Sequence, residues 1–166
     1  MKYLLDVNTL VALGHTTHVH HARAQAWLQA SRSTVESMGT CAITELGFVR
    51  VSVQAGLQRD IASARAAFSL IKKSSPIKFE FFSDAVGVDK LPAYVKGPGD
   101  LTDGHLLELA RAHGIQLATL DAGIPGSFYL PDKPGDWVVE EMAAAYGRKA
   151  VVKRTKSRRL STGQVA

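Results

Sequence analysis

Four acidic residues stand where their carboxylates could act together. Asp6 follows an apolar run near the N-terminus, and Asp121 follows a second run, QLATL. Glu45 and Asp103 each come in the first turn of an expected helix. Two unit charges about 4 Å apart repel by roughly 4 kcal/mol at an effective dielectric of 20. Four carboxylates in one cleft therefore need protons or cations to neutralise them.

A cluster made only of carboxylates indicates a hard divalent cation, Mg²⁺ or Mn²⁺, because no thiolate and no imidazole is required. Mg²⁺ held by a few carboxylates and waters is the usual arrangement for phosphoryl chemistry. Such an ion lowers the pKa of a bound water and stabilises charge on the phosphate. We therefore predict that four residues are metal ligands: Asp6, Glu45, Asp103 and Asp121.

The elements that must position these residues alternate along the chain. Strands are predicted over 2–7, 40–43, 77–83 and 115–121, and helices over 18–30, Thr44 to Gly56, 58–73 and Thr102 (as N-cap) to Gly114. SFYLP and DWVVEEM are alternative candidates for a last strand. This order predicts an α/β fold with a mostly parallel sheet of four to five strands. Ligands bind outside the carboxyl ends of such strands, so the four acids would share one edge.

Each acidic residue also has a simpler interpretation. Asp6 could begin an Asx-turn or cap the next helix, and Asp121 could be a turn residue. Glu45 and Asp103 could each favour the positive end of a helix dipole. One shared site explains four such positions better than four separate accidents do. Asp103 is preferred to the nearby Asp100, because the apolar helix pattern starts at Asp103.

Four segments carry a family resemblance. They are LLDVNTLVAL, AITELGFVRV, LTDGHLLELARAHG and LATLDAG, in that order. Their order and spacing resemble the PIN domain, and more closely the VapC-type ribonuclease toxins of bacterial toxin–antitoxin pairs. The resemblance runs from about residue 2 to about residue 130.

The resemblance implies a three-layer α/β/α nuclease domain, which we assign to residues 1–147, with a Mg²⁺- or Mn²⁺-dependent site that cleaves single-stranded or looped RNA. It gives the four acidic residues their catalytic role and matches Asn8 to the small polar residue that steadies the first aspartate. It also implies a homodimer, and an antitoxin whose C-terminal segment lies over the active site. Two alternatives stay open: a housekeeping RNA-processing nuclease, and a non-catalytic module that binds RNA or a partner.

The C-terminal segment 148–166 is strongly basic. It holds seven of the 20 Lys and Arg residues and no acidic residue, so residues 1–147 carry a net charge of −2 (13 basic against 15 acidic) in a chain of +5. A basic arm indicates an anionic partner such as nucleic acid. The residues expected to contact RNA there are Arg154, Lys156, Arg158 and Arg159. The alternative interpretation, given equal weight, is that segment 148–166 is a solvated end that only keeps the protein soluble.

Other motifs exclude several classes of protein. HTTHVHH holds four of the six histidines, but its spacing matches no closed zinc site. Asn8 stands where a haloacid-dehalogenase-type phosphatase needs a second aspartate, and a glycine-rich phosphate loop is absent. No apolar run of about 18 residues predicts a membrane span, and Asp6 interrupts any signal peptide. The lone Cys41 cannot form an internal disulfide, so we expect a cytoplasmic protein.

Overall fold

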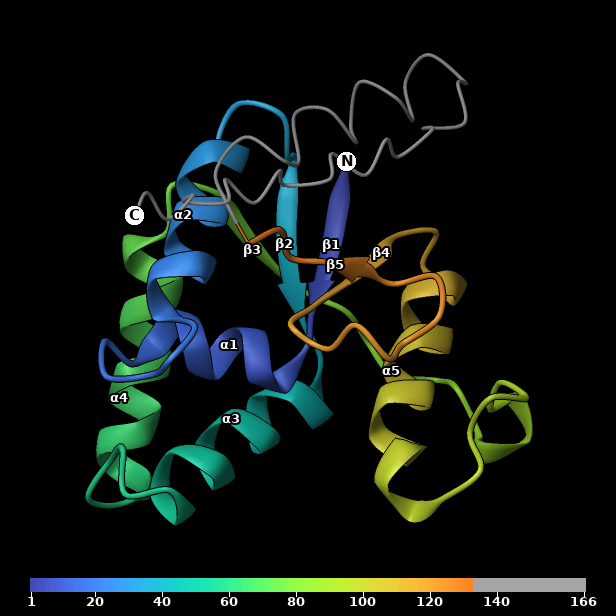
Figure 1. Cartoon of the computed structure of the whole chain (residues 1–166). Coiled ribbons are helices and arrows are strands. Elements are labelled where there is room, and N and C mark those ends of the chain that lie inside the picture. The colour runs from blue at the N-terminus through green and yellow to red at the C-terminus, as the bar shows by residue number, and fades with distance from the viewer. Residues whose placement is uncertain (133–166) are drawn as a thin grey trace, which may run out of the picture. The chain divides into compact units, whose positions relative to one another are not determined.

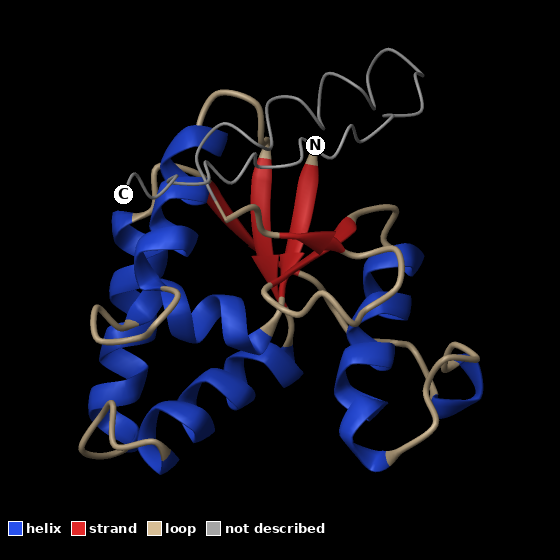
Figure 2. Ribbon diagram, viewed as in Figure 1, coloured by secondary structure: helices blue, strands red, loops and turns tan. Residues whose placement is uncertain are grey.

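The computed structural model describes residues 1–132, which form a five-stranded sheet with helices on both faces (Figure 1, Figure 2). The predicted α/β class is confirmed. In chain order the elements are β1 (Lys2–Leu5), α1 (Val7–Gly14), α2 (His21–Ser31), β2 (Ser37–Thr40), α3 (Ala42–Gln54), α4 (Ile61–Ser74), β3 (Lys78–Phe81), the 3-10 helices η1 (Val88–Lys90) and η2 (Pro98–Asp100), α5 (Leu101–Ala112), β4 (Gln116–Thr119) and β5 (Phe128–Tyr129).

The sheet has the strand order β3-β2-β1-β4-β5, and all four pairings are parallel. The central strand is β1, where Leu4 pairs with Gly39 of β2 on one side and with Leu117 of β4 on the other. The chain builds outward from β1 to β3 and then returns to the other side of β1. The strand order therefore reverses between β1 and β4, and a ligand crevice is expected at the carboxyl ends of these two strands.

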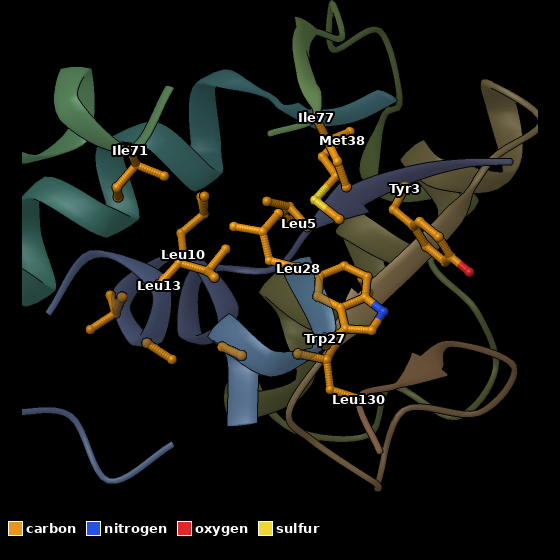
Figure 3. Packing of buried hydrophobic residues seen from close by; sticks show 14 of the residues in the cluster. Tyr3, Leu5, Leu10, Leu13, Trp27, Leu28, Met38, Ile71, Ile77 and Leu130 are labelled. Atoms are coloured by element: carbon orange, nitrogen blue, oxygen red, sulfur yellow. The ribbon is translucent and has the colours of Figure 1, made fainter. Parts of the chain in front are cut away.

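Alternation along β1 divides the core between the two faces of the sheet, since successive strand side chains point in opposite directions. Tyr3 and Leu5 pack in the larger cluster, with α1 to α4 (Figure 3), while Leu4 packs in the smaller cluster, against α5. Trp27 of α2 meets Tyr3 edge to face, with ring centroids 5.6 Å apart. Helices α1 to α4 cover one face and α5 the other (Figure 1), which gives the three predicted layers.

Helix α1 was not predicted, and the strand expected over 2–7 ends at Leu5 instead. Five consecutive residues of this helix, 9–13, are buried, so no exposed polar face marks the helical period. A short apolar run of this kind cannot be distinguished from a buried strand by periodicity alone. Asp6 is the N-cap residue of α1.

Two further boundaries were wrong. The strand expected over 40–43 ends at Thr40, because Cys41 is the N-cap of α3 and its N–H donates to Thr44 Oγ1 at 3.0 Å. Thr102 lies inside α5, whose N-cap is Asp100. SFYLP contains β5, whereas DWVVEEM lies outside the described residues.

The predicted domain end at 147 and the basic segment 148–166 also lie outside the described residues. The predictions for Arg154, Lys156, Arg158 and Arg159 thus stay predictions. Among residues 1–132, no helix has the length and apolar character needed to cross a membrane.

Candidate active site

Asp6 occupies the point where the strand order reverses. It is only 3% exposed, and its backbone N–H donates to Ala118 O of β4 at 3.1 Å. Its carboxylate Oδ2 accepts a hydrogen bond from Thr119 Oγ1 at 2.9 Å. Burial raises the pKa of Asp6 above the usual aspartate range, and the bond from Thr119 acts against that rise. Asp6 is thus a buried acid at the expected ligand crevice.

Thr119, the last residue of β4, joins two of the predicted site residues. Its buried hydroxyl donates to Asp6 and accepts a hydrogen bond from the backbone N–H of Asp121 at 3.0 Å. Asp121 Oδ1 in turn accepts from Gly123 N at 2.7 Å. Sequence reasoning missed Thr119, because its contact with Asp6 joins residues 113 positions apart and leaves no local signal.

Asp103 reaches the same region from the first turn of α5 and is half-buried. Burial, and then repulsion by Asp6, Asp121 and Asp100, raises the pKa of Asp103 to about 6. Asp6, Asp103 and Asp121 therefore lie close enough to interact, although they come from three separate parts of the chain. Asp100 is engaged elsewhere, because its Oδ2 accepts from the N–H groups of Lys96 and Gly97 at 3.1 and 3.2 Å.

The raised pKa of Asp103 predicts a pH-dependent stability of the metal-free protein. The folded state keeps a proton that the unfolded chain, with its ordinary pKa of 3.8, releases at lower pH. Stability is therefore lost as the pH rises from about 4 through about 6. Asp103→Asn should then raise the free energy of unfolding at pH 7.5, on the order of 1 kcal/mol after solvent screening, and raise it much less at pH 4.

Thermal unfolding in EDTA between pH 4 and pH 8, followed by circular dichroism, measures this effect. Asp89→Asn is the matched control, because Asp89 is exposed and lies in η1. A lower melting temperature for Asp103→Asn than for the wild type at pH 7.5 would contradict the expectation.

Glu45 is held by a hydrogen bond and an ion pair on the side of α4. Its Oε1 accepts hydrogen bonds from Thr40 Oγ1 and from Lys72 Nζ of α4, both at 2.7 Å. Glu45 is not among the charges that shift the pKa of Asp6 or Asp103. Three of the four predicted acids thus interact electrostatically, and the fourth is held in an ion pair with α4.

Asn8 is exposed in the first turn of α1 and lines a hollow together with Asp121. The start of α1 is fixed against α3 by a close approach, since a Cβ on Gly47 would come within 2.6 Å of Val7 Cγ2. Only glycine allows the two helices to meet this closely. Val7, the residue between Asp6 and Asn8, therefore packs directly against α3.

The acids near the strand-order reversal are candidate ligands for a divalent ion. Among residues 1–132, no three Asp, Glu, His or Cys side chains converge closely enough to form a complete metal site. The chemistry of the cluster nevertheless fits Mg²⁺, which binds through one or two carboxylates and keeps several waters. A cation would also relieve the repulsion that raises the pKa of Asp103. The residues available to hold it are Asp6, Asp103 and Asp121.

The family model of the PIN domain matches residues 3–125. The chain belongs to the PIN-domain family. The matched range of this PIN domain contains the five residues predicted for the catalytic site: Asp6, Asn8, Glu45, Asp103 and Asp121.

Two curated relatives come from Mycobacterium tuberculosis. This PIN domain is similar to ribonuclease VapC38, with 42% identity over 124 residues, covering 73% of this chain and 86% of that one. It is also similar to ribonuclease VapC29, with 41% identity over 127 residues and coverages of 75% and 89%.

Two solved structures share the fold. One is M. tuberculosis VapC20, described as a sarcin–ricin loop cleaving toxin (TM-score 0.52, 16% identity, 78% of this chain and 99% of that one). The other is VapBC2 from Rickettsia felis bound to a DNA fragment from its promoter (TM-score 0.55, 13% identity, 78% and 97%). At these identities the likeness concerns the fold alone.

Proposed function

We propose that this PIN domain is a Mg²⁺- or Mn²⁺-dependent endoribonuclease that hydrolyses RNA phosphodiester bonds. The observation that carries the proposal is that Asp6 and Asp121 act electrostatically on Asp103 where the strand order reverses. A protein that only binds RNA gains nothing from clustered negative charge facing phosphates. The relatives at 41–42% identity are named ribonucleases, which supports the same reaction.

The position of each residue indicates its role in the reaction. The ion would be held by Asp6, Asp103 and Asp121. Glu45 would be a fourth ligand after its ion pair with Lys72 breaks. When bound, the ion supplies an acidic water and charge stabilisation at the phosphate. Thr119 fixes the orientation of the Asp6 carboxylate, and Asn8 orients groups at the mouth of the site.

A structured RNA pool incubated with purified, folded protein and Mg²⁺ tests the proposal, and sequencing of product ends maps the cuts. Discrete internal cuts support the endoribonuclease, whereas an intact pool overturns it.

We also propose that the protein is the toxin of a toxin–antitoxin pair, a cytoplasmic homodimer neutralised by its antitoxin. The VapC names of the relatives support this role. Growth arrest on expression that coexpression of the antitoxin relieves would test it, and a housekeeping nuclease would cause no such arrest.

Thr119→Val is expected to lower the cleavage rate 10- to 100-fold, the usual effect of removing a group that orients a metal ligand. Valine keeps the shape of the side chain but removes both hydrogen bonds that join Asp6 to Asp121. Thr119→Ser keeps the hydroxyl and should retain most of the activity.

The Mg²⁺ concentration that gives the half-maximal rate distinguishes positioning from simple structural support. It should rise for Thr119→Val and stay unchanged for Thr119→Ser, with circular dichroism spectra alike for both. A Thr119→Val variant with the wild-type rate and Mg²⁺ requirement would show that Thr119 does not position the metal ligands.

A further inference from the structure

A hollow of about 420 Å³ lies directly beside the acidic cluster. Its lining residues are Asn8, His18, Val19, His20, Leu120 and Asp121. They come from the start of α1, the turn that leads into α2, and the segment after β4. The volume falls within the range of pockets that hold small organic ligands. Two of the histidines that the zinc interpretation could not use thus lie next to a predicted catalytic residue.

The hydrogen bonding of His18 defines what this hollow offers a ligand. His18 Nδ1 accepts the backbone N–H of His20 at 3.2 Å, so Nδ1 carries no proton. Burial, and then the neighbouring His20 and His21, lower the pKa of His18. The ring is therefore neutral at neutral pH, with its proton on Nε2. His18 offers one N–H donor and a flat aromatic ring rather than a positive charge.

The lining favours a nucleobase over a phosphate group. None of its six residues is lysine or arginine, and one of them, Asp121, is an acid that would repel an anion. The rings of His18 and His20 lie with centroids 5.8 Å apart, inclined by 51°. Proteins recognise unpaired RNA bases by stacking them on aromatic side chains, histidine included, and by hydrogen bonding to their edges. The rings of His18 and His20 offer stacking surfaces, and the Asn8 amide beside them offers hydrogen bonds to the edge of a base.

We propose that this hollow is a subsite for one unstacked RNA base next to the scissile phosphodiester. His18 and His20 provide the stacking surfaces, and the Asn8 amide bonds the edge of the base. The subsite rests on the proposed ribonuclease function, since contact with Asp121 is what places the bound nucleotide beside the reacting bond. It makes the turn between α1 and α2 a determinant of where the enzyme cuts.

The test is cleavage of an RNA library with a randomised single-stranded loop, with sequencing of the product ends. The wild type should show a base preference at one position beside the cut. His20→Ala should lower cleavage of the preferred sequence about tenfold and flatten the preference at that position alone, as expected for loss of one stacking contact. His20→Phe keeps a flat ring and should retain the preference. His113→Ala, at the far end of α5, is the control and should change nothing.

The outcomes separate the subsite from the nuclease. If His20→Ala cuts RNA with the wild-type base preference, the subsite is overturned and the proposed nuclease function is unaffected. A loss that is equal for all sequences, is not rescued by phenylalanine and comes with a weaker salt dependence indicates a phosphate contact, which also overturns it. No cutting by the wild type overturns the proposed function and the subsite together. His20 carries the test because replacing His18 also removes the acceptor that orders the turn.

Discussion

Asp6→Asn should abolish RNA cleavage, by about a thousandfold or more, which corresponds to roughly 4 kcal/mol of lost transition-state stabilisation. Asparagine has nearly the shape of aspartate and can still accept the hydrogen bond from Thr119. It lacks the negative charge that a divalent ion needs from a carboxylate at this position. The loss should therefore reflect the chemistry of the site rather than a change in its geometry.

The same substitution should not unfold the protein. Burial raises the pKa of Asp6, so the charged carboxylate is costly in the folded state, and an uncharged amide avoids that cost. At pH 7.5 in EDTA the melting temperature of Asp6→Asn should equal or exceed that of the wild type.

Cleavage of the structured RNA pool and thermal unfolding of the same preparations check both statements. Asp89→Asn makes the same chemical change at an exposed position in η1 and should keep full activity. A fully active Asp6→Asn protein would refute the assignment of the site. An inactive but poorly folded variant would contradict the stability argument.

Withdrawal of divalent metal should have an effect of similar size. EDTA should stop cleavage, and added Mg²⁺ or Mn²⁺ should restore it. Without a cation, Asp6, Asp103 and Asp121 repel both one another and the RNA phosphates. RNA binding should therefore weaken together with cleavage.

A readout independent of activity accompanies this experiment. An ion that binds the folded state alone raises the melting temperature, and the rise grows with its concentration. Mg²⁺ should stabilise the wild type in this way and stabilise Asp6→Asn much less. Cleavage that persists in EDTA would contradict metal dependence, and RNA binding unchanged by EDTA would favour a module that only binds.

Much of the architecture could be predicted because the local patterns agree with it. The apolar runs before Asp6 and Asp121 are strands, and Gly56 and Gly114 follow the ends of helices with positive φ values. Alternation of strands and helices then leads to a parallel sheet, and parallel strands place their following residues at one edge. The predicted strand ends thus led directly to Asp6 and Asp121.

Contacts distant in sequence escaped prediction. Thr119 meets Asp6 across 113 residues, and Lys72 meets Glu45 across 27. Nothing local distinguishes a threonine at a strand end that bridges two acids from one that only favours the strand. Helix α1 was missed for a related reason, because its burial on most sides removes the polar face that would mark it.

By itself the sequence determined the fold class and the order of the strands, and it predicted the chemical type of the site, since these depend on periodicity and on residues near element ends. Only the tertiary structure decided which acids share an electrostatic field, that Glu45 is paired with Lys72, and that His18 and His20 line a hollow beside Asp121. Those outcomes depend on side-chain directions and on close packing between helices and strands distant in the chain. Such packing becomes definite only when the whole core is assembled.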